Sequence, residues 1–174
     1  LNTLILAISY LYRIHTVTFL PFRTYNTDNQ LIIDTLIESK AFIYENHVLF
    51  NKNKTTLIAY RAKETNYTIP NSVTTIGEHA FSGCDSLTSI NIPNSVTTIG
   101  KFAFSDCASL VNINIPNSVT TIGKCAFDGC KSLTNINIPN SVTTIEDRAF
   151  RGCENLPSHI KSDIRQRFGE KVFK

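Results

Sequence analysis

The chain has 174 residues, of which 42% are hydrophobic and 18% are charged. A chain of this length and composition can bury a sizeable core, and it is too apolar for a disordered protein. The formal net charge of +3 arises from 17 Lys and Arg against 14 Asp and Glu. This excess is too small for the positive field on which nonspecific nucleic-acid binding depends, so we expect a folded protein that does not bind nucleic acid.

The first forty residues carry few readable signals. The apolar run from Leu4 to Leu11 is shorter than the ~20 residues that cross a bilayer, so it predicts a buried strand or short helix and no membrane span. A remnant of a signal peptide is the alternative. Ile37 and the pair Ala41-Phe42 echo an I-x-x-x-A-F pattern found later in the chain, which favours a degenerate copy of that pattern.

Two apolar segments, 48–50 and 57–60, flank the polar sequence Asn51-Lys-Asn-Lys. This pattern is typical of a β-hairpin with a turn of four to six residues. We expect residues 1–68 to form an N-terminal region in which this hairpin closes one end of the fold.

From Ile69 the chain repeats itself every 23 residues. The string I-P-N-S-V-T-T-I-G-E-H-A-F-S-G-C-D-S-L-T-S-I-N begins there and recurs from Ile92, from Ile115 and, in degraded form, from Ile138. A period of 20 to 29 residues with L-x-x-I-x-I is the signature of a leucine-rich-repeat solenoid, in which each coil turn stacks on the one before it. We expect an α/β-type solenoid with four such repeats over residues 69–157.

Positions that stay apolar in every copy form the predicted core, because stacking has to bury them. In the first copy they are Val73, Ile76, Ala80-Phe81 and Leu87. The alternation over Leu87–Pro93 marks a short strand that ends at Pro93, since proline cannot donate to a ladder. Equivalent strands would pair in parallel about 4.8 Å apart, as one narrow sheet on the concave face, with irregular or short helical connectors.

The outward positions of this predicted sheet are neutral and hydrogen-bonding. Amides and hydroxyls in register suit protein backbone or sugar hydroxyls better than phosphate, so we predict a ligand-binding surface for protein or glycan. The alternative is that these side chains only hydrogen-bond along the ladder. The predicted binding residues are Thr88, Ser89, Asn91, Val111, Asn112, Asn114, Thr134, Asn135 and Asn137.

Four of the five cysteines share one column of the repeat: Cys84, Cys107, Cys130 and Cys153. A ladder does not bring four thiols to one point, and its parallel side chains do not face one another, so we predict buried free thiols rather than zinc ligands or disulfides. The fifth, Cys125, shares a column with His79, Phe102 and Arg148. This variety predicts a surface position and the most reactive thiol.

We find no catalytic or cofactor-binding motif in the sequence. It contains no G-x-S-x-G, no H-E-x-x-H and no phosphate-binding glycine loop, and the histidines are scattered. We therefore predict no enzyme activity, no catalytic residue, no metal and no cofactor.

Residues 158–174 are predicted to form a C-terminal capping helix and a tail. Ile160, Ile164 and Phe168 recur on one face of a helix over 158–168, Ser158 is placed to cap its start, and Gly169 to end it. The opposite face carries Lys161, Arg165 and Arg167. It is predicted to be the solvated side of the cap, and an anchor for acidic lipid or a partner is the alternative.

The repeat resembles the BspA-type leucine-rich repeats, whose units read L-x-x-I-x-I-P-x-S-V-x-x-I-x-x-x-A-F-x-x-C. The resemblance is close over 69–156 and looser over 43–68. It implies a non-catalytic protein at the cell surface or secreted, which adheres to host matrix or plasma proteins or to other cells, although a cytoplasmic location stays open. A structural subunit that self-associates laterally or end to end is the alternative function.

Overall fold

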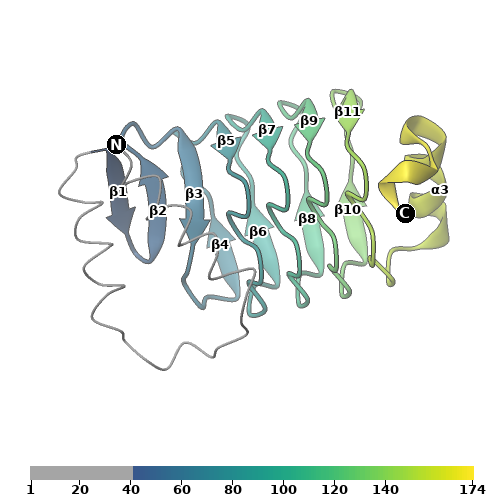
Figure 1. Ribbon diagram of the computed structural model, residues 1–174, viewed down its shortest axis with the longest axis horizontal. Coiled ribbons are helices and arrows are strands. Elements are labelled where there is room, and N and C mark those ends of the chain that lie inside the picture. Colours follow the sequence, from purple (N-terminus) through teal and green to yellow (C-terminus); the bar gives the residue numbers. More distant parts are fainter. Residues whose placement is uncertain (1–40) are drawn as a thin grey trace.

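The computed structural model describes residues 41–174, so the predictions for residues 1–40 lie outside the described part of the chain. The described residues form a solenoid whose coil turns lie side by side (Figure 1). One end carries β1 (Phe42–Glu45), β2 (Val48–Asn51) and β3 (Thr56–Tyr60), and the other carries the helix α3 (Ser158–Phe168). This confirms the predicted leucine-rich-repeat class. Among the described helices, none has the length and apolar character needed to cross a membrane.

Each coil turn contributes a strand to each of two sheets. The four-stranded sheet is parallel, in the order β10-β8-β6-β4, and consists of β4 (Asn66–Thr68), β6 (Ser89–Asn91), β8 (Asn112–Asn114) and β10 (Asn135–Asn137). The seven-stranded sheet has the order β1-β2-β3-β5-β7-β9-β11. Its strands are β1 (Phe42–Glu45), β2 (Val48–Asn51), β3 (Thr56–Tyr60), β5 (Thr75–Ile76), β7 (Thr98–Ile99), β9 (Thr121–Ile122) and β11 (Thr144–Ile145).

The prediction of a single sheet was therefore incomplete. The four-stranded sheet is the predicted one, with Ile90 paired to Ile113 and Ile113 to Ile136. The additional strands are Thr-Ile pairs, such as Thr98-Ile99, which is paired in register with Thr121-Ile122. Two residues are too few for an alternation of apolar and polar positions to be recognised in the sequence.

The third side of each coil turn is held by backbone hydrogen bonds although it contains no strand. The N–H of Phe81 donates to the carbonyl of Ala103 at 2.7 Å, and the N–H of Phe104 donates to that of Ala126 at 2.7 Å. The connectors between the strands of residues 66–157 are turns rather than helices. Every predicted core position of the repeat is buried inside the coil.

Phenylalanine rings form a ladder through the core. The ring centroids lie 5.0 Å apart for Phe81 and Phe104 and 5.4 Å apart for Phe127 and Phe150. Tyr60 extends the ladder at the N-terminal end and Phe173 at the C-terminal end, at 5.0 and 6.0 Å from their neighbours. Equivalent residues of successive repeats thus stack on one another, as the 23-residue period predicts.

The place of Phe173 in the ladder was not predicted, although Phe173 lies 23 residues after Phe150. The N–H of Phe150 donates to the carbonyl of Val172 at 2.8 Å, just as in the earlier turns. Val172-Phe173 therefore takes the place of the Ala-Phe pair in one further coil turn. The signal was hard to see because a helix replaces the strand residues of that turn.

The N-terminal hairpin is confirmed, since β2 and β3 pair antiparallel. A further strand, β1, pairs with β2 through a turn at Asn46 and His47, which both have positive φ, as tight hairpin turns require. Phe42 lies in β1, so its echo of the repeat does not correspond to a coil turn, contrary to the prediction.

The C-terminal helix α3 (Ser158–Phe168) has the predicted bounds and buries Ile164. Ser158 does not cap it, because the N-cap residue is Pro157 and no side chain caps the N-terminus. Gly169 ends the helix with φ of 84°, which glycine adopts readily. A short 3-10 helix, η1 (Glu170–Val172), follows.

The basic residues of α3 hold the cap together. Arg167 donates to the carbonyls of Ile138 and Pro139 at 2.7 and 2.9 Å. Arg165 pairs with Glu170 and lies over the ring of Phe173, and Lys161 donates to the carbonyl of Glu154. These contacts support the capping interpretation over an anchor for lipid.

Candidate binding face

The outer surface of the four-stranded sheet carries the predicted binding residues in register. Ser89, Asn112 and Asn135 form one row, and Asn91, Asn114 and Asn137 form a second. Thr88, Val111 and Thr134 precede the strands β6, β8 and β10. We call these nine residues the polar stripe. The structure thus brings the six strand residues to one face of the sheet and places Thr88, Val111 and Thr134 directly before it.

The contribution of β4 to this face was not predicted from the sequence. Asn66 pairs in register with Ser89, and Thr68 pairs with Asn91, so both rows extend by one residue. The signal is the sequence Asn66-Tyr-Thr-Ile-Pro, which matches the Asn-Ile-Asn-Ile-Pro of the later copies at Asn66, Ile69 and Pro70.

Part of the polar stripe hydrogen-bonds along the solenoid. Thr88 and Thr134 donate from Oγ1 to the carbonyls of Thr65 and Val111 at 2.9 and 3.4 Å. Ser89 donates from Oγ to Oδ1 of Asn66. These hydroxyls therefore hold neighbouring coil turns together, which is the alternative role considered for this face.

The asparagines of the polar stripe differ from its hydroxyls. Their side chains are exposed, and no hydrogen bond joins any of them to another group within residues 41–174. Each amide therefore offers donors and an acceptor to a ligand. These residues are Asn91, Asn112, Asn114, Asn135 and Asn137.

A shallow groove of about 530 Å³ follows the connection between the two sheets. Asn91 and Asn114 lie on its side toward the four-stranded sheet, Asn71 and Asn94 belong to the Pro-Asn-Ser turns, and Pro93 and Pro116 also line it. Ile92 and Ser95 complete the lining. We call this the junction groove, and its lining contains no charged residue.

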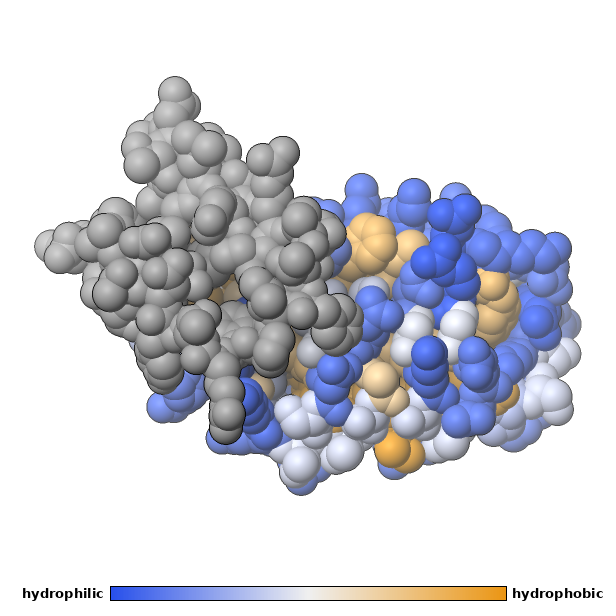
Figure 2. Space-filling model, turned by 60° about the horizontal axis from the view of Figure 1, so that its bottom comes forward, coloured by the Kyte–Doolittle hydropathy of each residue, from blue (hydrophilic) through white to orange (hydrophobic). Residues whose placement is uncertain are grey.

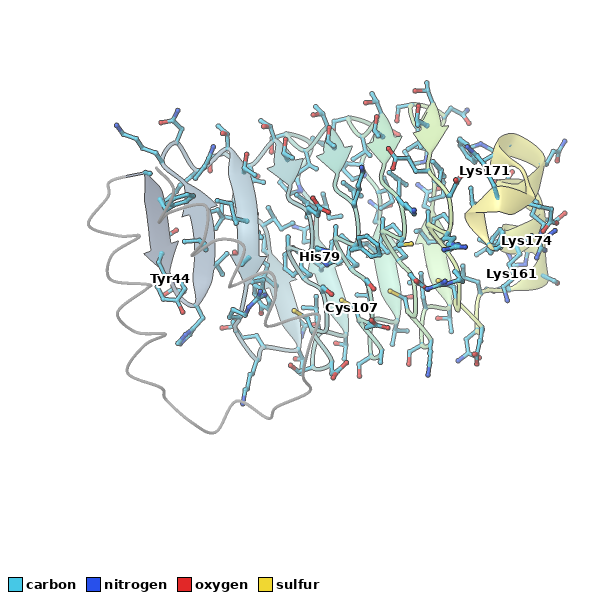
Figure 3. The ribbon with its side chains drawn as sticks, viewed as in Figure 1. Tyr44, His79, Cys107, Lys161, Lys171 and Lys174 are labelled. Carbon is cyan, nitrogen blue, oxygen red and sulfur yellow. The ribbon has the colours of Figure 1, made fainter. Side chains whose placement is uncertain are left out.

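Hydrophilic residues make up most of the described surface visible in Figure 2, and apolar residues appear there as separate patches. Three lysines, Lys161, Lys171 and Lys174, lie around α3 at the C-terminal end of the solenoid (Figure 3). The candidate binding residues thus form a neutral surface away from these lysines.

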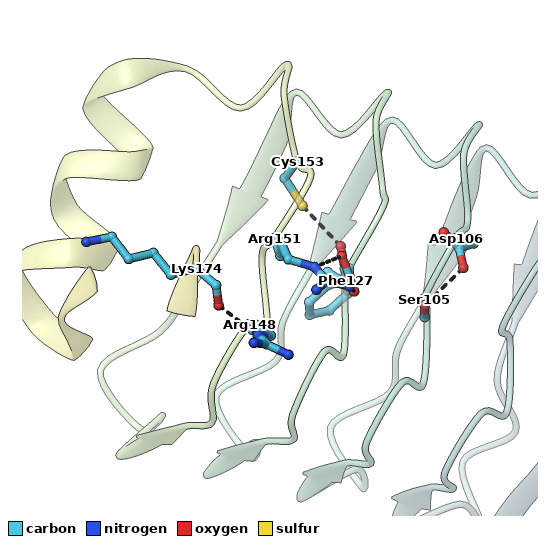
Figure 4. A network of polar contacts seen from close by, with 8 residues as sticks. Ser105, Asp106, Phe127, Arg148, Arg151, Cys153 and Lys174 are labelled. Carbon is cyan, nitrogen blue, oxygen red and sulfur yellow. Dashed lines mark hydrogen bonds and ion pairs between the residues drawn. The ribbon is translucent and has the colours of Figure 1, made fainter. Parts of the chain in front are cut away.

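The cysteine ladder is internal and serves the fold. Cys107, Cys130 and Cys153 are buried free thiols, and each Sγ donates to the carbonyl of a phenylalanine in the preceding turn at 3.0 to 3.1 Å. Figure 4 shows this contact between Cys153 and Phe127. Burial raises the pKa of the Cys153 thiol to about 12 and that of Cys107 well above its ordinary value. These three are buried free thiols, as predicted, and the structure adds that they act as hydrogen-bond donors; Cys84 of the same column is only partly buried, contrary to the prediction.

Cys125 is buried, contrary to the prediction of a surface thiol, with only 3% of its area exposed. Its column neighbours Phe102 and Arg148 are larger, so a variable column does not expose its smallest member. Burial, followed by the nearby charge of Asp128, raises the pKa of the Cys125 thiol, which opposes reactivity.

His79 does not form a catalytic pair with Cys125. Its ring stacks on Phe102 with centroids 4.7 Å apart, and Phe102 occupies the turn between the two residues. Within residues 41–174, no group of three or more His, Cys, Asp or Glu side chains is placed to hold a metal ion.

The family model of the BspA-type leucine-rich repeat region matches residues 57–174 in six copies. The match extends beyond the four copies read from the sequence and covers the turns of both Tyr60 and Phe173. No curated protein matches the chain.

Solved bacterial structures share the fold. A leucine-rich repeat protein from Eubacterium ventriosum ATCC 27560 is 34% identical, with a TM-score of 0.57, over 67% of this chain and 38% of that protein. A second, from Bacteroides ovatus ATCC 8483, is 34% identical, with a TM-score of 0.50, over 76% of this chain and 34% of that protein. A leucine rich cell surface protein from Faecalibacterium prausnitzii A2-165 is 31% identical, with a TM-score of 0.55, over 75% and 43%. The chain thus spans less than half the length of each of these proteins.

Proposed function

The chain belongs to the family of BspA-type leucine-rich repeat proteins, and we propose that it is a non-catalytic module that binds a protein at the surface of a host tissue or another cell. The family consists of repeat modules that generally lack enzyme activity. One of the similar structures is described as a cell surface protein, which supports an extracellular location.

The main support for the proposal is that the asparagines of the polar stripe are aligned in rows. Five asparagine amides are exposed, in register and without a hydrogen bond to the described protein, on a sheet whose inner face belongs to the buried core. Because the strands that carry these amides are already paired in a sheet, binding a partner backbone restricts the asparagine side chains but requires no ordering of their backbone. Their neutrality favours a polar, uncharged epitope.

The size of the sheet limits the affinity of a single copy. Four strands spaced by ~4.8 Å extend over only about 15 Å, so the sheet offers less than the roughly 800 Å² per partner of a stable interface. We therefore expect weak binding by one molecule and strong binding when several copies are displayed together.

The test compares the chain with a triple variant in which Asn112, Asn114 and Asn135 are replaced by alanine. Each protein is displayed as a tetramer and applied to immobilised matrix and plasma proteins. We expect at least a tenfold loss of binding in the triple variant, with an unchanged melting temperature. Lys101→Ala is the matched control, because this exposed side chain lies outside the polar stripe.

Equal binding by the triple variant and the native chain would refute the polar stripe as the contact surface. Light scattering on the untagged chain tests the alternative of a structural subunit. A monomer at micromolar concentration agrees with the proposal, whereas concentration-dependent oligomers without any added partner favour lateral or end-to-end assembly.

A further inference from the structure

The coil turn that leads into β8 departs from the other repeats at two positions three residues apart. Ala108 occupies a position at which the other three repeats have a charged residue, namely Asp85, Lys131 and Glu154. Val111 occupies the position that threonine takes in the coil turns on either side. One coil turn therefore has apolar residues where its neighbours have polar ones. We call Ala108 and Val111 the apolar contact site.

The core of the solenoid does not explain these two residues. Ala108 and Val111 are half-buried, whereas Leu110 between them is completely buried. The N–H of Val111 donates to the carbonyl of Thr88 at 3.0 Å, as expected for the stack. The hydroxyl of Thr88 also donates to the carbonyl of Thr65 at 2.9 Å, and valine cannot make the equivalent bond. Val111 thus lacks a hydrogen bond on the outer surface and adds no fully buried side chain to the core in exchange.

Opposite charges flank the apolar contact site along the solenoid axis. In the column of Ala108, the preceding coil turn carries Asp85 and the following one carries Lys131. Both side chains are exposed, and neither forms an ion pair or a side-chain hydrogen bond within residues 41–174. An apolar centre with a polar and charged margin is the usual anatomy of a protein interface. The charge order favours a partner that carries a basic group at one end and an acidic group at the other.

The spacing of these groups fits one face of an α-helix. Asp85 and Lys131 are two coil turns apart, which is about 10 Å in a stack of parallel strands. A helix along the solenoid axis presents residues i, i+3 and i+7 on one side over about 10.5 Å. An extended peptide presents three residues on one side over about 13 Å. The helix therefore matches the column more closely than the extended peptide does.

We propose that the apolar contact site binds an α-helix of the partner protein. An apolar side chain of the helix packs on Ala108 and Val111, and its flanking basic and acidic residues pair with Asp85 and Lys131. The proposal rests on the protein-binding role proposed above, and it adds a charged helix to the uncharged epitope expected for the polar stripe. The helix lies along the margin of the stripe, because Val111 directly precedes β8.

The probes are two monomeric, alanine-rich helical peptides of about 20 residues, titrated with the full chain and followed by fluorescence anisotropy. One peptide carries Lys, Leu and Glu at i, i+3 and i+7. The other carries Glu, Leu and Lys at i, i+4 and i+7, so that both directions along the solenoid are tested. We expect one of them to bind, and its affinity to fall about tenfold when its leucine is replaced by glutamine. Replacing its Lys and Glu by glutamine should lower the affinity about threefold at low salt.

The variants Val111→Thr and Ala108→Lys introduce residues that other repeats carry at the same backbone positions, so the melting temperature should stay unchanged. Each variant should lower the affinity for the helical peptide about three- to tenfold, because it places a polar group in the apolar centre. Thr143→Val is the matched control. It exchanges the same two residue types at an exposed position before β11, and it should leave the affinity within about twofold of the native value.

The proposal is overturned if neither peptide binds, or if Val111→Thr and Ala108→Lys bind the peptides as tightly as the native chain. An extended peptide with the same three residues that binds more tightly than both helices also overturns it. Asn114→Ala separates the two proposals, because Asn114 lies in the row of the polar stripe farther from Val111. This variant should weaken binding to the matrix and plasma proteins and leave peptide affinity unchanged. Failure of either proposal is thus visible without failure of the other.

Discussion

The rings of Phe104 and Phe127 are parallel within 1°, with their centroids 5.3 Å apart. Offset parallel stacking at this distance is favourable, and both rings are completely buried. The two residues are 23 positions apart. The sequence period is therefore visible as a physical stack through the centre of the molecule.

Replacing Phe104 by alanine tests how much the ladder stabilises the solenoid. The substitution opens a cavity between two coil turns that cannot collapse independently, so we expect the free energy of unfolding to fall by about 3–5 kcal/mol. Urea denaturation followed by circular dichroism measures the change. Phe102→Ala is the control, since that ring is only half-buried and should matter less. A loss below about 1 kcal/mol for Phe104→Ala would contradict the stacked core.

The repeat made the buried residues predictable because stacking converts each recurrent letter into a column. It did not reveal the Thr-Ile strands, which are too short to show a period of two, nor the turn completed by Phe173, whose strand residues are replaced by α3. Cys125 was predicted to lie at the surface because residues of very different types occupy its column. Its burial depends instead on the size of the neighbouring side chains. The nine residues of the polar stripe could be placed on one face, whereas the groove depends on how the two sheets meet.

Asp106 occupies a backbone position that the other repeats give to glycine. Its φ is 57°, and the equivalent Gly83, Gly129 and Gly152 have φ of 69° to 72°. A side chain in this left-handed region costs about 1–2 kcal/mol, partly offset in Asp106→Gly by the greater freedom of the unfolded chain. We therefore expect Asp106→Gly to raise the free energy of unfolding by about 0.5–1 kcal/mol in urea denaturation.

The control for this prediction is Asp106→Ala, which keeps the Cβ atom in the left-handed conformation and removes the contact with Ser105. It should destabilise the protein, so the two variants should change the stability in opposite directions. Equal effects of glycine and alanine would show that the backbone conformation at Asp106 carries no strain.

Alkaline pH should destabilise the fold through its buried thiols. Burial raises the pKa of Cys84 and Cys153 to about 12, against an ordinary thiol value of 9.0. Between these two values the unfolded chain releases thiol protons that the folded chain retains, so the unfolded state is favoured as the pH rises. We expect the urea midpoint to fall steadily from pH 9 to 12 under reducing conditions.

The variant Cys153→Ala tests the origin of this pH dependence. It removes one of the thiols whose pKa is raised by burial. The urea midpoint of the variant should therefore decline less steeply with pH than that of the native chain, whatever the stability of the variant at pH 7. Tyr60 and Tyr67 contribute in the same direction, because burial raises their pKa to about 12. An identical decline in the native chain and the variant would assign the effect to groups other than Cys153.

Arg167 is predicted to stabilise the C-terminal end of the solenoid by satisfying two backbone carbonyls. Its guanidinium donates to Ile138 and Pro139, which follow the last strand of the four-stranded sheet and have no further coil strand beside them. Arg167→Met keeps most of the aliphatic packing and removes both donors, so we expect a loss of about 1–3 kcal/mol in urea denaturation. Arg167→Lys should recover only part of this loss, because one ammonium group lacks the planar fork that reaches two successive carbonyls.

Arg165→Met is the control for this prediction. Arg165 forms a solvent-exposed pair with Glu170 and contacts no strand carbonyl, so its replacement should cost no more than about 1 kcal/mol. If the two methionine variants unfold at the same urea concentration, the carbonyl contacts of Arg167 do not hold the cap in place, and the packing of Ile164 and Phe173 must do so alone.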